Sequence, residues 1–382
     1  MRQTRHAYPE QSETDAAPLR DLPLRAFHWL SVVAVAVAVA AMTGFLAPSW
    51  WQPVHVIAGY VLACLLAFRI LWGVFGSRFS QFQSFSLSIS GTIRYLRDIA
   101  AGHNPTFDGH NPAGTWMIFI LLALLAALVA SGLLLLGGQE KLGPLAAAVA
   151  YQTARRFRDI HEIAAWALLG VVTLHLLGVA FDTLVQKHPA LTAMVTGTKP
   201  GWKPPSPAAN RAWTRRGMVL AGLSSLVLIG IGTGLSSLPA KGYAPIHYPD
   251  VYKTECADCH SIYHPSLRTA GAWRKMMSQL SDHYGEDASL PDADNQAITD
   301  FLTANNAEAF DTEASWRIGR QDTPSLRMTD TGYWKRRHRK IENTAFNDPA
   351  VGSKANCAAC HQDAATGLFA DGKIHLPERN RK

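Results

Sequence analysis

Five uninterrupted apolar stretches in the first 240 residues constrain this chain more than any other feature. Each is long enough for a membrane-spanning helix, which needs roughly 20 apolar residues; they lie at 26–46, 54–76, 115–136, 160–181 and 218–239. A segment inside a bilayer must be a helix or part of a closed barrel, because no water is present to satisfy its backbone. Only 17% of all residues are charged, which argues against an ordinary soluble enzyme. We therefore expect an all-α membrane protein rather than a large soluble protein with five buried helices.

The formal net charge of +7 comes from the apolar half of the chain. It therefore indicates membrane topology rather than a nucleic-acid-binding face. Lys and Arg favour the cytoplasmic ends of spans, and here they concentrate in the N-terminal arm and in the segments at 77–114 and 182–217. We predict a multi-pass protein of the bacterial inner membrane, in contact with lipid, with a cytoplasmic N-terminus and a periplasmic C-terminal domain. Arg155, Arg156 and Arg158 are an exception on the periplasmic side.

Four of the five cysteines form two Cys-x-x-Cys-His motifs near the C-terminus. The motifs consist of Cys256, Cys259 and His260, and of Cys357, Cys360 and His361. This spacing is typical of c-type haem attachment, in which both thiols form thioethers and the histidine binds iron. One such motif would also fit a redox dithiol or half of a zinc site, but two motifs in an extracytoplasmic domain indicate two covalent haems. The fifth cysteine, Cys64, is expected to act as a small packing residue.

Each covalent haem needs a second axial ligand, and the motifs alone leave that ligand open. The candidates in the C-terminal domain are several histidines and methionines: His247, His264, His283, His338, His375, Met276, Met277 and Met328. Any one of the histidines also fits a solvated surface position.

The C-terminal region, at about 245–380, resembles the dihaem cytochrome c (DHC) family. The resemblance is carried by both motifs and by the residues at 282–290, 334–338 and 351–356. It implies two bis-histidine haems with His283 and His338 as the further ligands. We pair His283 with the first haem and His338 with the second. The resemblance also suggests a small oxygen-binding c-type cytochrome as redox partner.

Four histidines lie within the predicted spans, where ionisable residues are costly and functional by default. The chain reverses direction with every span, so His28 and His175 share the cytoplasmic level, and His55 and His161 share the periplasmic level. Fourteen residues separate His161 from His175, which is about 21 Å and close to four turns of one helix. Each pair is predicted to hold one non-covalent haem b. The structural alternative is that the histidines hydrogen-bond neighbouring helices together.

The membrane region at about 20–200 resembles the prokaryotic cytochrome b561 family. The matching segments are 24–29, 59–60, 68–78, 111–114, 161–162 and 194–197, together with His175. The resemblance implies a four-helix bundle that holds two haems b and exchanges electrons with quinone. We predict four regions: a cytoplasmic arm at 1–23, the b561-like domain at 24–200, a linker and fifth helix at 201–240, and a periplasmic, mainly α-helical dihaem domain at 241–382.

Two arginines in this region carry specific expectations. Arg158 lies beside the periplasmic haem site, and we predict that it binds a haem propionate, for which a guanidinium is well suited. The alternative is an exposed charged face. Arg69 lies near the end of the second span, where a long side chain can extend to the membrane surface.

The four predicted haems favour a relay of electrons between the quinone pool and a periplasmic protein, which we expect to be a c-type cytochrome. Such a protein would have quinol:cytochrome c oxidoreductase-type activity, although the sequence does not set the direction of flow. Two alternatives stay open. One is a superoxide- or substrate-oxidising quinone reductase, and the other is the cytochrome b subunit that anchors a dehydrogenase or hydrogenase complex.

Overall fold

A computed structural model describes residues 19–42, 48–77, 79–103, 105, 107, 111–187, 190–198, 207–321 and 323–376. Most of the predicted cytoplasmic arm at 1–23 and the linker residues at 201–206 lie outside these ranges. The described part of the chain is helical and contains no strand.

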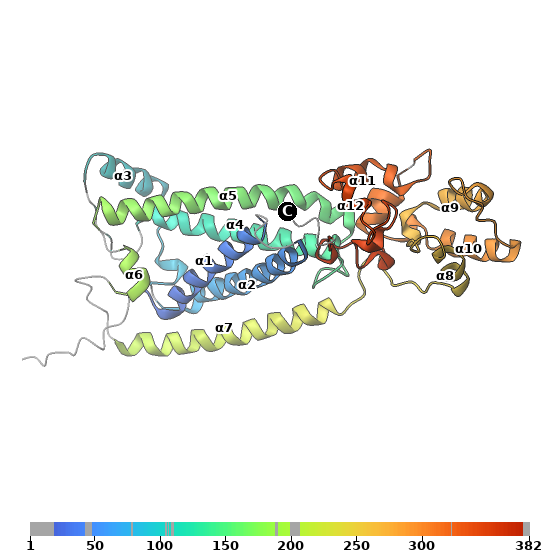
Figure 1. Ribbon diagram of the computed structural model, residues 1–382. Coiled ribbons are helices and arrows are strands. Elements are labelled where there is room, and N and C mark those ends of the chain that lie inside the picture. Colours follow the sequence, from blue (N-terminus) through green and yellow to red (C-terminus); the bar gives the residue numbers. More distant parts are fainter. Residues whose placement is uncertain are drawn as a thin grey trace, which may run out of the picture. The chain divides into compact units, whose positions relative to one another are not determined.

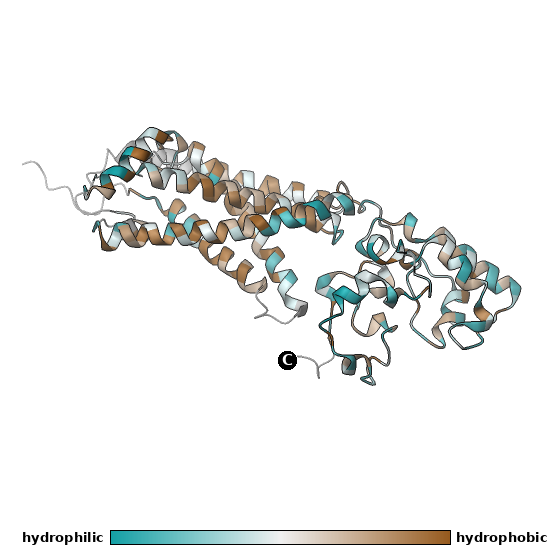
Figure 2. Cartoon of the chain, turned by 90° about the horizontal axis from the view of Figure 1, so that it is seen from above, coloured by the Kyte–Doolittle hydropathy of each residue, from teal (hydrophilic) through white to brown (hydrophobic). Residues whose placement is uncertain are grey.

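Five long helices are long and apolar enough to cross a membrane. They are α1 (Leu22–Met42), α2 (Pro48–Phe75), α4 (Pro112–Gly138), α5 (Tyr151–Leu184) and α7 (Pro207–Ser236) (Figure 1). They coincide with the five predicted spans, and the ribbon of the long helices in Figure 2 carries the apolar colour along much of its length. The protein is therefore an all-α membrane protein, as predicted.

Helix α5 begins nine residues before the predicted apolar stretch at 160–181. Arg155, Arg156 and Arg158 consequently lie on the first turns of α5. Two shorter helices, α3 (Ile89–Ala100) and α6 (Ala190–Thr196), connect the long ones. Ser88 caps α3, because its side chain accepts a hydrogen bond from the Gly91 backbone N–H at 3.0 Å.

The chain forms two compact units. Unit 1 comprises the chain up to Ala36 together with Gly59–Val129 and Glu162–Ile229, and unit 2 comprises Val37–Ala58, Ala130–His161 and Gly230–Lys382. This division passes through all five long helices. The four regions expected from the sequence stay a prediction.

Unit 1 has an apolar core of small and branched side chains, namely Ala34, Leu62, Leu66 and Leu125. It also has a buried polar network around Asp21, whose carboxylate accepts hydrogen bonds from Trp72 Nε1 at 3.1 Å and Ser80 Oγ at 2.9 Å. Arg69 belongs to this network. The sequence led us to expect that its side chain extends to the membrane surface, and this expectation is wrong. The residue is 2% exposed, and its guanidinium donates a hydrogen bond to the Ser80 carbonyl at 3.2 Å.

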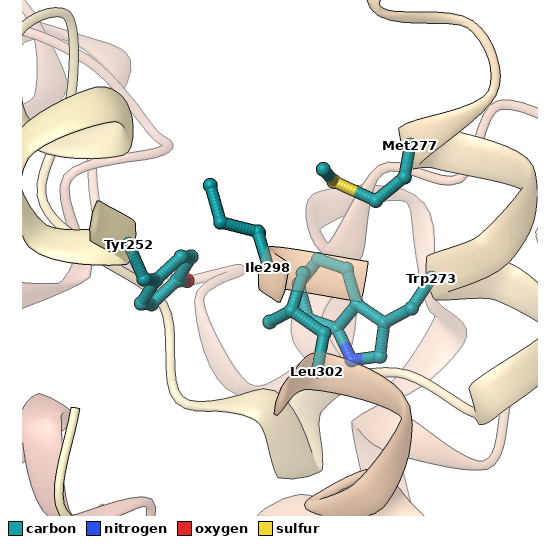
Figure 3. Packing of buried hydrophobic residues seen from close by; sticks show 5 residues of the cluster. All are labelled: Tyr252, Trp273, Met277, Ile298 and Leu302. Atoms are coloured by element: carbon teal, nitrogen blue, oxygen red, sulfur yellow. The ribbon is translucent and has the colours of Figure 1, made fainter. Parts of the chain in front are cut away.

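The C-terminal part of unit 2 is built from short helices joined by turns. These helices are α8 (Asp250–Ala257), α9 (Ala270–Met277), α10 (Asp292–Ala304), α11 (Gly332–Arg337) and α12 (Asn343–Phe346). Side chains from α8, α9 and α10 form one apolar core, shown in Figure 3: Tyr252, Trp273, Met277, Ile298 and Leu302. This core supports the segment that contains the first Cys-x-x-Cys-His motif.

Candidate functional site

Eight histidine side chains form four pairs with nearly equal separations. The ring centres are 6.5 Å apart for His28–His175 and 6.2 Å apart for the other three pairs, which are His55–His161, His260–His283 and His338–His361. Two imidazoles that bind one metal ion from opposite sides, with bonds of about 2 Å each, place their ring centres about 6.3 Å apart. The four pairs thus have the spacing that bis-histidine haem ligation requires.

The His28–His175 pair lies in unit 1, where α1 and α5 each supply one ring. Several buried donors in and directly before the first turns of α1 have no hydrogen-bonding partner within the described residues. They are Arg20 Nη1, Arg25 Nε and His28 Nδ1. Arg25 follows Arg20 by five residues, and both arginines contact Gly197. Buried polar groups normally find partners, so these donors fit a bound group that carries acidic substituents, as haem does.

The His55–His161 pair lies in unit 2, and a second hydrogen bond fixes each ring. His55 Nδ1 donates to the Ala38 carbonyl at 3.0 Å, and His161 Nδ1 hydrogen-bonds with Ser131 Oγ at 2.8 Å. Metal-binding histidines usually engage their other ring nitrogen in this way, which orients the ring and sets its tautomer. Both rings of this pair are therefore held for ligation through Nε2.

Helix α4 contributes to the same site although it has no histidine. Ser131 orients His161, and the neighbouring Gly132 lets the ring approach, since a Cβ at Gly132 would lie 3.3 Å from His161 Cε1. Sequence reasoning missed this contribution. The available signal is the Ser-Gly pair, which interrupts the Leu/Ala-rich run of the third span.

His283 lies beside His260 of the first Cys-x-x-Cys-His motif. A tight turn positions it: the His283 backbone N–H donates to the Glu286 carbonyl at 2.7 Å, while Tyr284 and Gly285 adopt φ values of +60° and +100°. His260 Nδ1 donates to the Ser261 carbonyl at 2.9 Å. The turn thus presents the predicted second ligand to the predicted first ligand.

His338 lies beside His361 of the second motif, at the end of α11. Its Nδ1 donates to the Trp334 carbonyl at 2.9 Å, and the Trp334 ring stacks on it with centres 4.3 Å apart. Burial lowers the pKa of His361 to about 4 and also lowers the pKa of His338. Both rings are therefore neutral at pH 7, which is the form that binds metal.

The four motif cysteines fit thioether formation. No disulfide joins any two of the five cysteines, so the motif cysteines stay available for thioether bonds. Within the described residues, no group of three or more His, Cys, Asp or Glu side chains is arranged to hold a bare metal ion.

Another candidate ligand, His264, has a different environment. It is 1% exposed, packs against the rings of Tyr248 and Phe310, and hydrogen-bonds through Nδ1 with Ser266 Oγ at 2.8 Å. Its ring pairs with no motif histidine among the ring contacts of the described residues. The structure thus brings His283 and His338, rather than His264, to the motifs.

Arg158 faces carboxylates of its own chain. Its charge acts on Glu140 and Asp371, two acidic side chains that sequence analysis did not select. Burial raises the pKa of Glu140 to about 7, and the negative charge of Asp371 raises it further, whereas a hydrogen bond from Gln52 and the charge of Arg158 oppose the rise. The predicted contact between Arg158 and a haem propionate stays a prediction.

Two family models match the chain. Prokaryotic cytochrome b561 matches residues 19–197, and dihaem cytochrome c matches residues 252–369. No curated protein matches the chain.

Three solved structures are similar to the C-terminal region. A diheme cytochrome c from Rhodobacter sphaeroides is 35% identical, with 33% of this chain and 100% of that chain covered and a TM-score of 0.29. A second structure of DHC from the same organism is 34% identical, with coverages of 32% and 99% and a TM-score of 0.26. A diheme cytochrome c from Shewanella baltica is 27% identical, with coverages of 34% and 96% and a TM-score of 0.28. By the two family matches, the chain is a membrane electron-transfer haem protein that belongs to the prokaryotic cytochrome b561 family at residues 19–197 and to the dihaem cytochrome c family at residues 252–369.

Proposed function

We propose that this protein relays electrons from quinol in the bacterial inner membrane to a small c-type cytochrome in the periplasm. The observation that carries the proposal is the set of four histidine pairs with ring centres 6.2–6.5 Å apart. Two pairs lie in membrane helices, and two include the histidine of a Cys-x-x-Cys-His motif. We propose two haems b at the first two pairs and two haems c at the others.

Each bound haem supplies reversible one-electron chemistry at its iron. The chain would supply two imidazoles to each haem, and iron bound by two histidines would favour a relay over substrate chemistry. Residues behind the ligands hold the rings in place: Ser131 and the Ala38 carbonyl at the His55–His161 pair, and Trp334 at His338. Rigid ligands favour electron transfer because little has to rearrange when the iron changes charge.

The proposed orientation places the N-terminus in the cytoplasm and the C-terminal region in the periplasm. The distribution of Lys and Arg along residues 1–240 supports it. The two Cys-x-x-Cys-His motifs also support it, because bacteria attach c-type haem outside the cytoplasm. Electrons would then enter from the membrane and leave on the periplasmic side.

The test uses the purified full-length protein in lipid nanodiscs. A pyridine haemochrome spectrum should give equal amounts of haem b and haem c. Added quinol should then reduce both types, and an oxidised small c-type cytochrome should reoxidise them. A protein whose haems quinol leaves oxidised would contradict the proposal. Reduction by superoxide with formation of quinol would instead identify a quinone reductase, and a co-purifying catalytic subunit would identify an anchor.

A further inference from the structure

Asp311 joins the C-terminal region of unit 2 to the connection between α4 and α5. Its carboxylate accepts hydrogen bonds from Lys141 Nζ at 3.1 Å, from the Tyr151 backbone N–H at 2.8 Å and from Trp316 Nε1 at 2.8 Å. The Lys141 side chain is fully buried. A buried ion pair holds a specific geometry when its remaining hydrogen-bonding groups are satisfied, and three donors satisfy this carboxylate.

The turn at Asp371–Lys373 makes a second contact, with the start of α2. Gly372 lies directly against Gln52, so that a Cβ at Gly372 would collide with the Gln52 amide oxygen. Gln52 in turn hydrogen-bonds to Glu140, and the carboxyl group of Glu140 interacts electrostatically with Asp371. Gln52 precedes the haem ligand His55 by three residues, which is about one helical turn.

The same turn is part of the second Cys-x-x-Cys-His site. The His375 backbone N–H donates to the Cys360 carbonyl at 2.8 Å, and the Gln362 N–H donates to the Lys373 carbonyl at 3.1 Å. Asp371 also binds Arg337 at 2.7 Å, next to the ligand His338. Direct contacts therefore connect the His55–His161 site with the His338–His361 site.

The first Cys-x-x-Cys-His site connects to the second one. Ser261 Oγ, next to His260, donates to Asn356 Oδ1 at 2.8 Å. Tyr263 Oη donates to the Ala355 carbonyl at 2.8 Å. Asn356 immediately precedes Cys357, so these contacts link the two motifs themselves.

We infer that the second covalent haem site, rather than the first, exchanges electrons with the His55–His161 site, and that the first site follows it in the relay. The inference rests on the proposed function and adds the order of the sites to it. Each step moves one electron from a reduced iron to an oxidised iron, without a proton or an atom. The rate of such a step falls steeply with distance, so the packing of the sites determines their order. The order is the same for either direction of flow.

A cross-linking experiment tests this placement without any measurement of activity. The full chain would carry Cys64→Ala, Gln52→Cys and Gly372→Cys, with a protease site in the linker at 201–206. After mild oxidation in membranes and cleavage, the two fragments should stay joined until a reductant is added. The matched control replaces Gly372→Cys with Gly271→Cys, at a glycine on α9 with open space around its Cβ position. The control should not cross-link.

The inference is overturned if the 52–372 pair fails to cross-link, or if the 52–271 pair cross-links equally well. The second result would mean that the region of the second motif lies no closer to the start of α2 than α9 does. Folding is checked in both variants by their haem b and haem c content, because thioether-bound cysteines in a correctly loaded protein cannot contribute to the cross-link.

A kinetic measurement then tests whether electron transfer depends on the contact between the C-terminal region of unit 2 and the α4–α5 connection. Asp311→Asn leaves the buried Lys141 charge without its partner, so we expect electron transfer between haems b and c to slow about tenfold or more. The control, Asp250→Asn, removes an exposed pair with Lys253 on α8 and should leave the rate unchanged. Equal rates in Asp311→Asn and the parent chain would contradict the inference. If quinol reduces no haem in the parent chain, the proposed function fails, while the cross-link still decides the placement.

Discussion

The membrane histidine pairs and the C-terminal histidine pairs have similar separations but are assembled in different ways. In the membrane helices, the partners are distant in sequence, as in His28–His175, and helix packing alone brings them together. In the C-terminal region, 23 residues separate the partners in both pairs, and a local turn or a short helix presents the second ring. The membrane sites therefore depend on the whole bundle, whereas the C-terminal sites depend on local folding and on covalent attachment. The following predictions test this difference.

The largest effect is expected at a membrane pair. His161→Ala removes one of two ligands from a haem that no covalent bond retains, so this haem should be lost. The haem b content should fall by about half, because the His28–His175 site remains, and haem c should be unchanged. The measurement is a pyridine haemochrome spectrum, with His103→Ala in an exposed loop as control. Full haem b content in His161→Ala would refute the assignment of this ligand.

The corresponding change at a covalent site should be milder. His283→Ala should keep its haem, because the thioethers of Cys256 and Cys259 remain, but should open one coordination position. The reduced protein should then bind carbon monoxide, and one haem should change its spin state in the optical spectrum. His338→Ala should behave in the same way at the second site. Absence of carbon monoxide binding in both variants would show that other residues provide the axial ligands.

A glycine in the C-terminal region tests how strongly these sites depend on local turns. Gly367 has φ +73°, and a Cβ there would lie 2.6 Å from His264 Cγ. Gly367→Ala should therefore lower the free energy of unfolding by about 2 kcal/mol or more. The loss arises because alanine disfavours the left-handed conformation and because its Cβ would collide with the His264 ring. Thermal denaturation followed by circular dichroism measures the loss. The control is Gly271→Ala in α9, which should be neutral or stabilising by up to about 1 kcal/mol.

The pKa of Glu140 gives a pH-dependent prediction for unit 2. Burial raises this pKa to about 7, so between about pH 4.5 and 7 the folded chain holds a proton that the unfolded chain releases. Stability should therefore fall as the pH rises through this window and level off above pH 7. Glu140→Gln should remove this part of the pH dependence, whereas Glu308→Gln at an exposed position should not. Melting temperatures at pH 5 and pH 8 provide the comparison, and an unchanged difference in Glu140→Gln would contradict the prediction.

The smallest effect is expected at Arg158. This residue lies on α5 near the ligand His161, and its charge also acts on Asp371 of the C-terminal region. If Arg158 binds a propionate of the haem at His55–His161, Arg158→Gln should lower the reduction potential of that haem, because a nearby positive charge is lost. The other haem b should keep its potential. A redox titration of both haems b measures the change, and identical curves for the variant and the parent would reject the role.

Much of this architecture could be predicted from the sequence, because it rests on local patterns. Apolar length gave the five spans, and the motif spacing identified the covalent sites. Alternation of chain direction predicted which membrane histidines lie together. These patterns need no knowledge of tertiary contacts.

The remaining features depend on residues that meet only in the folded chain. Asp311 and Lys141 are 170 residues apart, and neither belongs to a motif. Ser131 looks like a small residue in an apolar run, and its role follows from the position of His161 on another helix. Arg69 satisfies the rule for extension to the membrane surface, but Ser80 and a buried network provide better partners.

Helix α5 has a consequence for biogenesis. This single helix contains His161 and His175, and the backbone N–H of its first residue, Tyr151, donates a hydrogen bond to Asp311. Binding of either haem b would therefore fix the rotation of α5 about its axis. This would place the second histidine of α5 in position to bind the other haem b. Haem insertion into the membrane helices should accordingly be cooperative. When haem is limiting, few molecules should contain just one haem b.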